Sequence, residues 1–391
     1  MLTELLQGVQ LENLVDTTEL SFNQWANQIG YIQHLEENEW KKYDIALLGV
    51  YDYRLSRNIK SDINGADKVR KQLYQLFNWD NRLKFLDLGN ILPGHSVRDT
   101  FVAVERVVRE LLLNNVIPII ISNSQELTYY QYQAYEVLEK DITAAVFDET
   151  IDFNYDPDDP YVQSYIYKML AHRPHYLYNY LQLGYQHYLV NPDNVETLVQ
   201  MHNECYRLAY FLTDIRRIEP MTRHANMVSF DISAIRYADA PGQQQASPNG
   251  FSGHDACRIA RYAGISDKMS SYGLYEYYPS KDPNGLTAQL LAQCIWHFAE
   301  GFYARKFDDP EAFEQDYIRY NVTLNENGEE LVFLKSRRSD RWWMKVPVVN
   351  DRLKKKYELV PCLKEEYNAA CRREIPDRWM QAYIKHSTTG V

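Results

Sequence analysis

Short apolar runs alternate with helical segments over most of the chain, and this alternation limits the fold more than any other feature. The runs favour strands because they are brief and apolar on both faces. We expect strands at 43–50, 84–89, 116–121, 142–147, 180–183, 226–231 and 274–278, and helices at 66–77, 100–114, 127–139, 161–171, 194–210, 254–263 and 286–304. Buried strands joined by helices favour a parallel sheet with helices on both sides.

The two ends of the chain have different patterns. Residues 1–42 place Leu11, Leu14, Leu20 and Phe22 among acids, which predicts an amphipathic helical segment. We assign 43–306 to one α/β domain. From 307 to 391, a hairpin signal at 325–330, flanked by 321–324 and 331–334, and a charged, aromatic stretch predict an α+β appendage. So short a segment buries little alone, so we expect it to pack on the main domain or on a partner.

Composition excludes several classes of protein. The net charge of -11 argues against general nucleic-acid binding. The sequence has no apolar run long enough to span a membrane, and an early acid without a basic region argues against a signal peptide. The five cysteines form no C-x-x-C pair, so neither a disulfide framework nor a zinc knuckle is expected. We therefore expect a cytoplasmic protein.

Polar side chains follow three of the expected strands directly. Gln125 follows 116–121, Asp148 and Asp152 follow 142–147, and Asp231 ends 226–231 with Ser233 two residues later. Ligands of parallel sheets bind at the carboxyl ends of strands, so these side chains are expected to share one site. The alternative is that the acids are ordinary turn residues and Gln125 is a loop amide.

These segments resemble the metal motifs of the arginase, or ureohydrolase, family. The stretch 122–128 (SNSQELT) stands where the family has G-G-D-H-S, 148–152 (DETID) where it has D-A-H-x-D, and 231–233 (DIS) where it has D-x-D before Ala-Pro-Gly. The stretch 275–279 (YEYYP) resembles the family's V-E-V-N-P, which makes Glu276 the acid of the guanidinium pocket. The details are most similar to formiminoglutamase-like members. The resemblance implies a three-layer, arginase-like sandwich with a mainly parallel sheet.

The resemblance also implies two manganese ions, which this chain matches incompletely. The first ion would be held by Gln125, Asp148, Asp152 and Asp231, an all-oxygen set that suits Mn²⁺, Mg²⁺ or Ca²⁺. The private ligands of the second ion fall on a threonine and a serine, which are poor substitutes for imidazole and carboxylate. We therefore expect at most one divalent cation and loss of the second site. Without a cation, the clustered carboxylates would repel, and at least one would have a raised pKa.

Three hypotheses follow for function. The first is a pseudoenzyme: a ureohydrolase scaffold with a degraded dimanganese site and a binding or regulatory role. The second is an active hydrolase of a linear amidine C–N bond, with Asp148 and Glu276 as catalytic residues and His95, His187 or His254 as proton shuttles. The third is a different fold without a parallel sheet. The expected partners are a small amidine or amino-acid-like ligand, a protein bound through the appendage, and further copies of the chain in a homo-oligomer; neither nucleic acid nor a membrane is expected.

Overall fold

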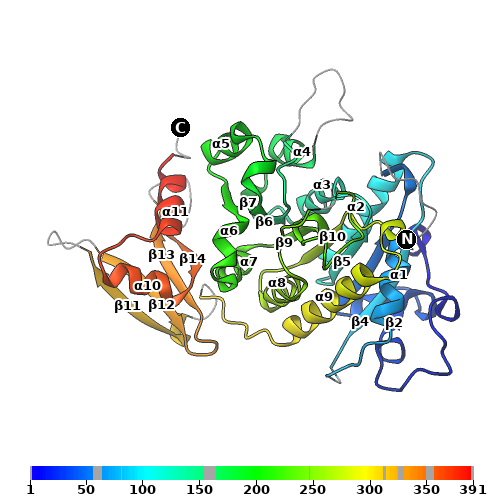
Figure 1. The fold of residues 1–391 in the computed structure, drawn as a ribbon. Coiled ribbons are helices and arrows are strands. Elements are labelled where there is room, and N and C mark those ends of the chain that lie inside the picture. Colours follow the sequence, from blue (N-terminus) through cyan, green and yellow to red (C-terminus); the bar gives the residue numbers. More distant parts are fainter. Residues whose placement is uncertain are drawn as a thin grey trace.

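A ten-stranded sheet forms the centre of the molecule (Figure 1). The computed structural model describes residues 2–55, 64–80, 82–153, 164–245, 247–310, 314–324, 330–348 and 356–388. The strands follow the order β1-β4-β3-β5-β10-β9-β6-β7-β8, and β2 pairs with β4 outside this path. Only β1 is antiparallel to its neighbour. Their bounds are β1 Leu6–Gln7, β2 Gly30–Tyr31, β3 Ile45–Val50, β4 Phe85–Ile91, β5 Ile117–Ser122, β6 Ile142–Phe147, β7 Leu177–Tyr185, β8 Glu204–Arg207, β9 Met227–Asp231 and β10 Ser271–Tyr275.

Helices cover both faces of this sheet. One face carries α1 (Gly65–Leu73), α6 (Leu208–Leu212), α7 (Ile218–His224), α8 (Gly253–Ile265) and α9 (Leu286–Tyr303). The other carries α2 (Val97–Leu113), α3 (Leu127–Gln133), α4 (Tyr165–Ala171) and α5 (Pro192–Gln200). Successive strand residues enter opposite cores: Leu47 packs in the first and Leu48 in the second. The expected three-layer sandwich with a mainly parallel sheet is therefore confirmed, and we call it the α/β body.

Side-chain caps fix where several helices begin. Ser96 and Asp99 form a reciprocal capping box at the start of α2, and Ser252 and Asp255 form another at α8. Each box satisfies backbone N–H groups that have no partner inside the first turn of a helix. α2 and α8 therefore begin at Val97 and Gly253, close to the starts at 100 and 254 that we expect from the sequence.

A buried ion pair fixes α1 against β4. Arg70 is fully buried, and its Nε donates to Asp87 Oδ2 at 2.9 Å. Its Nη2 donates to the carbonyl of Gly89 at 2.7 Å, and the hydroxyl of Tyr74 donates to Asp87 Oδ2 at 2.8 Å. Asp87 therefore compensates the charge of Arg70, and other N–H donors of Arg70 have acceptors too, as a buried guanidinium requires.

The N-terminal segment 1–42 is not the amphipathic helix that its apolar spacing predicts. Over residues 2–42 the chain forms short 3₁₀ turns and the strands β1 and β2, both of which pair with β4. Close packing explains part of this: a Cβ at Gly30 would lie 2.1 Å from the hydroxyl oxygen of Tyr43. Polar side chains also bond to the backbone, since Gln33 Nε2 donates to the carbonyl of Val9 at 2.6 Å.

Two further sequence expectations need correction. The helix expected over 194–210 stops at Gln200, and the chain turns through His202, whose φ is +58°, into the edge strand β8. So short a strand shows no period that a sequence reading detects. The strand expected over 274–278 instead ends at Tyr275, because Glu276 adopts a left-handed φ of +63°.

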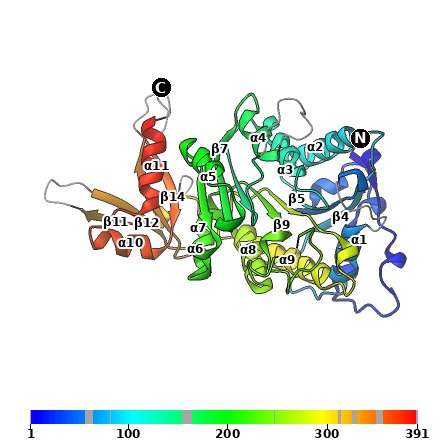
Figure 2. The ribbon, with the colours of Figure 1, turned by 45° about the horizontal axis from the view of Figure 1, so that its top comes forward.

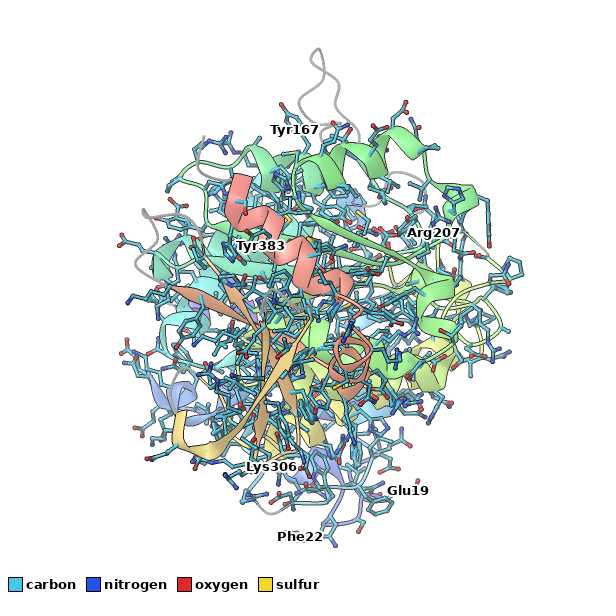
Figure 3. All side chains as sticks on the ribbon, turned by 90° about the vertical axis from the view of Figure 1, so that its left-hand side faces the viewer. Glu19, Phe22, Tyr167, Arg207, Lys306 and Tyr383 are labelled. Atoms are coloured by element: carbon cyan, nitrogen blue, oxygen red, sulfur yellow. The ribbon has the colours of Figure 1, made fainter. Side chains whose placement is uncertain are left out.

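The C-terminal appendage is a second, smaller unit with its own core. Its antiparallel sheet has the order β11-β12-β13-β14. The strands are β11 Tyr317–Thr323, β12 Glu330–Ser336, β13 Trp342–Pro347 and β14 Tyr357–Cys362, and the helices are α10 Lys364–Cys371 and α11 Asp377–Thr388. The expected hairpin connection at 325–329 lies outside the described residues. Figure 2 shows this unit on the side of the body away from the N-terminus, and Figure 3 shows α11, which carries Tyr383, in front of the body.

The appendage packs on the α/β body through polar contacts. Arg223 of α7 is buried and donates to the carbonyls of Trp342 (3.2 Å) and Cys362 (3.1 Å) in the appendage. Its guanidinium carbon also lies 4.3 Å from the ring centre of Trp343. The appendage thus packs on the main domain, which is one of the two arrangements that we expect from the sequence. No helix within the described ranges is both long and apolar enough to cross a membrane.

Candidate ligand site at the strand ends

Four neighbouring strands bring the predicted site residues together. In the sheet the order is β5-β10-β9-β6, so their carboxyl ends lie side by side. Gln125 follows β5, Glu276 follows β10, Asp231 ends β9 and Asp148 follows β6. The parallel arrangement therefore gathers side chains from distant parts of the sequence at one edge.

Gln125 lies between two of the acids. With its amide nitrogen toward them, it donates to Asp148 Oδ2 at 3.0 Å and to Asp231 Oδ2 at 3.2 Å. This orientation is the one that pairs a donor with the two carboxyl groups, whereas the reverse would set an amide oxygen against acceptors. Both acids and the glutamine are buried. The amide therefore bridges two carboxyl groups that would otherwise repel each other.

Backbone and hydroxyl donors occupy the remaining oxygens of these two acids. Asp148 Oδ1 accepts from the backbone N–H of Thr150 at 2.8 Å and from its hydroxyl at 3.2 Å. The same hydroxyl lies 3.2 Å from Asp152 Oδ1. Asp231 Oδ1 accepts from the backbone N–H of Ser233 at 2.7 Å. Every carboxyl oxygen of Asp148 and Asp231 thus already has a donor from the protein.

Burial changes the acidity of this cluster. Loss of hydration raises the pKa of Asp148 well above its usual value, and the nearby charge of Asp152 adds to the rise. Burial is also the main cause of the raised pKa of Asp231, with further contributions from Asp148 and Glu276. These directions follow from keeping negative charges together in a poorly hydrated site. The cluster therefore retains protons more readily than exposed carboxylates do.

Glu276 faces the same cluster from β10. Its Oε1 accepts from the backbone N–H of Gln125 at 2.8 Å, and its Oε2 accepts from the hydroxyl of Tyr278 at 2.6 Å. Burial raises the pKa of Glu276 to about 7, although both hydrogen bonds oppose that shift. The left-handed backbone at this residue turns its side chain away from the line of the strand.

A cavity of about 330 Å³ opens above these acids. We call it the acid cavity, because five carboxyl groups line it. Its lining residues are Leu55, Ser124, Glu126, Glu149, Thr150, Asp152, Ser164, Asp231, Ser233, Gln244, Gln245, Glu276 and Tyr278. The charge of one of these acids is compensated by a lysine, since Lys168 Nζ lies 2.8 Å from Glu126 Oε2. The cavity thus favours a cationic ligand.

Not every predicted residue reaches this cavity. Gln125 and Asp148 lie beneath its surface, while Asp152, Asp231 and Glu276 line it. None of the three candidate shuttle histidines, His95, His187 and His254, is part of its described lining.

Sequence reasoning did not name two of the lining acids as site residues. They are Glu126 and Glu149. A signal was present for both, because each directly follows a predicted site residue. Within the described ranges, no group of three or more His, Cys, Asp or Glu side chains is arranged to hold a metal ion.

Comparison with known proteins shows which family matches this chain. Residues 43–300 match the model of the arginase family, which is more than half of the chain. The chain is 23% identical over 275 residues to a formimidoylglutamase of Staphylococcus haemolyticus, covering 67% of this chain and 88% of that protein.

Solved structures share the fold. Formiminoglutamase of Trypanosoma cruzi, solved with Mn²⁺, superposes with a TM-score of 0.63 at 17% identity, covering 69% of this chain and 97% of that one. Formimidoylglutamase of Bacillus subtilis gives 0.63 at 14% identity, covering 76% and 99%. Agmatine ureohydrolase of Thermoplasma volcanium gives 0.58 at 18% identity, covering 77% and 98%. The family match ends at residue 300, before the appendage begins.

Proposed function

Because the chain belongs to the arginase family, we propose that it binds a small amidinium- or guanidinium-bearing ligand at the strand-end site without two-metal hydrolysis. The ligand would bind at the same strand-end site as in the family, but the residues beneath it would not hold two metal ions. It corresponds to the first of the three hypotheses drawn from the sequence, a ureohydrolase scaffold with a binding role.

One observation carries this proposal: protein donors occupy the carboxyl oxygens where the family has metal ions. Gln125 and Thr150 stand at the family's histidine positions, and Ser233 stands at an acid position. The bridging amide of Gln125 contacts both Asp148 and Asp231. A dinuclear manganese centre therefore does not fit these residues, since its second ion would have only hydroxyl groups of its own. We accordingly derive no metal-bound step.

The acid cavity supports a cationic ligand of modest size. Its volume of about 330 Å³ is at the lower end of the range for small-molecule pockets. Glu276 at its wall is placed to accept hydrogen bonds from an amidinium or guanidinium group, which is a charge-assisted contact. Serine, threonine and glutamine side chains in the lining supply neutral partners for the rest of such a ligand.

A second candidate is hydrolysis of a formimidoyl-type substrate. The relative from Staphylococcus haemolyticus is named for such an activity, and its alignment covers most of that protein. Asp148, Asp152, Asp231 and Glu276 are retained at the matching positions. This candidate would need Gln125 to turn its amide oxygen toward a cation.

Restoring the family residues tests the proposal. We expect the wild-type protein, loaded with Mn²⁺ and desalted, to retain fewer than two ions per chain and to leave N-formimidoylglutamate intact. The triple variant Gln125→His, Thr150→His and Ser233→Asp should retain two, because it rebuilds both imidazoles and the lost acid. Metal content by plasma mass spectrometry and product release are the two measurements.

A matched control separates motif positions from a general gain of imidazole. Gln244→His adds a histidine to the wall of the same cavity but outside the three motifs, so it should retain no additional manganese. Turnover by the wild-type protein that disappears in Asp148→Ala would overturn the proposal in favour of the second candidate.

Ligand binding is checked separately with agmatine, which carries a guanidinium group. Calorimetry should detect its binding to the wild-type protein and a roughly tenfold weaker binding to Glu276→Gln, because a charge-assisted bond becomes a neutral one. Glu196→Gln, an exposed change on α5, should bind as the wild type does. Equal binding by all three proteins would contradict the assignment of Glu276.

A further inference from the structure

A second hollow lies on the outer side of the body, at the end of the sheet that carries β7 and β8. Its volume is about 560 Å³. Its lining comes from three segments: 185–188 after β7, 207–212 at the start of α6, and the loop residues 236 and 248–250. We call it the outer groove. Figure 3 labels Arg207, which belongs to it.

The floor of the outer groove is apolar and open to solvent. Most of the atoms that line it are apolar, and they include side chains of Leu208, Ala209 and Leu212. Leu212 is 60% exposed, and Tyr188 on the facing segment is 68% exposed. Isolated exposed apolar residues are ordinary, but several that share one hollow mark a binding surface.

The charges around this floor are positive. The lining contains two arginines, Arg207 and Arg236, and its described residues include no carboxylate. Arg236 is compensated, because its Nε lies 2.8 Å from Asp239 Oδ2. Arg207 is exposed, and across the described part of the chain its guanidinium makes no hydrogen bond or ion pair. One permanent, uncompensated positive charge therefore stands beside an apolar floor, in a protein whose net charge is -11.

We propose that the outer groove binds a small monoanion with an apolar body, an aryl or acyl carboxylate. The carboxylate pairs with Arg207, whose planar guanidinium accommodates both oxygens. The apolar body covers the floor formed by Leu208 and Leu212 and contacts the ring of Tyr188. A single uncompensated cation matches a single negative charge on the ligand, which is why we commit to a monoanion.

This site is separate from the acid cavity and has the opposite charge preference. Gln186 lies between the two: it lines the outer groove, and its Nε2 donates to Glu149 Oε2 at 3.0 Å, on the wall of the acid cavity. A cation in one hollow and an anion in the other would therefore not compete. The inference does not depend on the proposed function of the acid cavity.

The test uses phenylacetate as the probe and the full-length protein. Saturation-transfer NMR and calorimetry should detect its binding to the wild type, and added salt should weaken that binding. Arg207→Gln should weaken it roughly tenfold, because the charge-assisted pair is lost. Arg98→Gln, an exposed arginine on α2 outside the groove, should leave it unchanged. Phenylacetamide, which has the same shape without the charge, should bind the wild type as weakly as phenylacetate binds Arg207→Gln.

Several outcomes would overturn the proposal. One is absence of phenylacetate binding to the wild type at a probe concentration of tens of millimolar. Another is equal binding of phenylacetate and phenylacetamide, or equal binding by the wild type and Arg207→Gln. Sedimentation gives a third: if the wild type self-associates and Leu212→Asp dissociates it, the groove is an interface between copies of the chain. Arg207 is exposed, so its variant is expected to fold, and circular dichroism checks this.

Discussion

Gln125 shows how a single neutral side chain changes the chemistry of a site. An imidazole at this position would direct a lone pair toward a cation, whereas the amide directs two N–H bonds toward two acids. The amide therefore holds Asp148 and Asp231 together with no charge of its own. The raised pKa values of both acids fit this arrangement, because a neutral donor offsets only part of the cost of burying each acid near other carboxylates.

A substitution of Arg70 tests how much its buried ion pair with Asp87 contributes to stability. Arg70→Met would leave Asp87 buried without its cationic partner, and losing one member of a buried pair costs about 3–5 kcal/mol. We expect a fall of this size in the free energy of unfolding, measured by urea denaturation. Lys71→Met, an exposed neighbour on the same helix, should change it by less than about 0.5 kcal/mol. A loss below about 1 kcal/mol for Arg70→Met would mean that the pair contributes little.

Which residues gather at the site could be predicted from the sequence, but what they do there could not. Gln125, Asp148, Asp231 and Glu276 each follow an expected strand, and parallel strands bring such positions together. The direction of the Gln125 amide depends on which acids surround it in space. The left-handed turn at Glu276 also has no signal in a sequence that offers no glycine there.

At the scale of elements, α8 and α9 pack with their backbones in close approach. A Cβ at Gly264 of α8 would lie 2.1 Å from the carbonyl oxygen of Phe298 on α9. Glycine is normally a poor helix residue, so its use inside α8 indicates that the contact outweighs its cost in helix propensity. The two helices together cover the middle of one sheet face.

We expect Gly264→Ala to destabilise the protein despite the better helix propensity of alanine. Propensity would contribute about 1 kcal/mol of stability, but forcing two backbones apart typically costs about 1–3 kcal/mol or more. Gly253→Ala in the first turn of α8 is the matched control, because its Cβ would meet side chains rather than backbone, the nearest being the movable Leu290 at 3.3 Å. Urea unfolding compares the two. A gain in stability for Gly264→Ala would show that the helices are less closely packed.

Strands and helices of the body could be predicted because their burial leaves clear patterns in the sequence. The core strands β3, β5 and β6 are buried at every residue and read as short apolar runs, whereas the buried residues of a helix such as α2 recur every three or four positions. The N-terminal segment escaped prediction because its conformation comes from pairing with β4 rather than from its own pattern. The same holds for β8, whose one strand partner among the described residues is β7.

At the scale of the whole molecule, a partly buried carboxylate joins the appendage to the body. Glu358 of β14 accepts from the hydroxyl of Tyr178 at 2.8 Å and lies 3.2 Å from His224 Nε2 and 2.7 Å from His386 Nε2. The other charged groups that act on this cluster are Lys385, Lys268, Arg378, Glu204 and Asp141. Burial lowers the pKa of His224, and hydrogen bonds lower that of Glu358 despite its burial.

Both shifts make the protein less stable in acid. A histidine whose pKa is lowered by folding binds fewer protons when folded, so its contribution is complete above about pH 6.5 and falls below it. The lowered pKa of Glu358 acts in the same direction, from about pH 4.5 downward. In addition, His224 Nδ1 is buried with no hydrogen-bond partner among the described residues, so a second ring proton would find no acceptor there.

We therefore expect the free energy of unfolding to fall between pH 7.5 and pH 5.5, by at most about 1.4 kcal/mol per pH unit for each proton involved. His224→Gln should reduce this slope, because glutamine keeps a donor for Glu358 but does not titrate. His95→Gln, an exposed histidine outside the interface, should leave the slope unchanged. Urea denaturation across this range measures all three proteins, and an unaltered slope in His224→Gln would contradict the assignment.

The position of α11 bears on whether the protein aggregates at high concentration. Strand β8 ends the large sheet, and one of its sides has no strand partner among the described residues. Arg378 and Gln381 of α11 reach Glu204 and Tyr206 of that strand. Open sheet edges recruit other chains and lead to aggregation, and proteins commonly cover them. The appendage thus covers part of this edge, and we expect the α/β body without it to aggregate more readily.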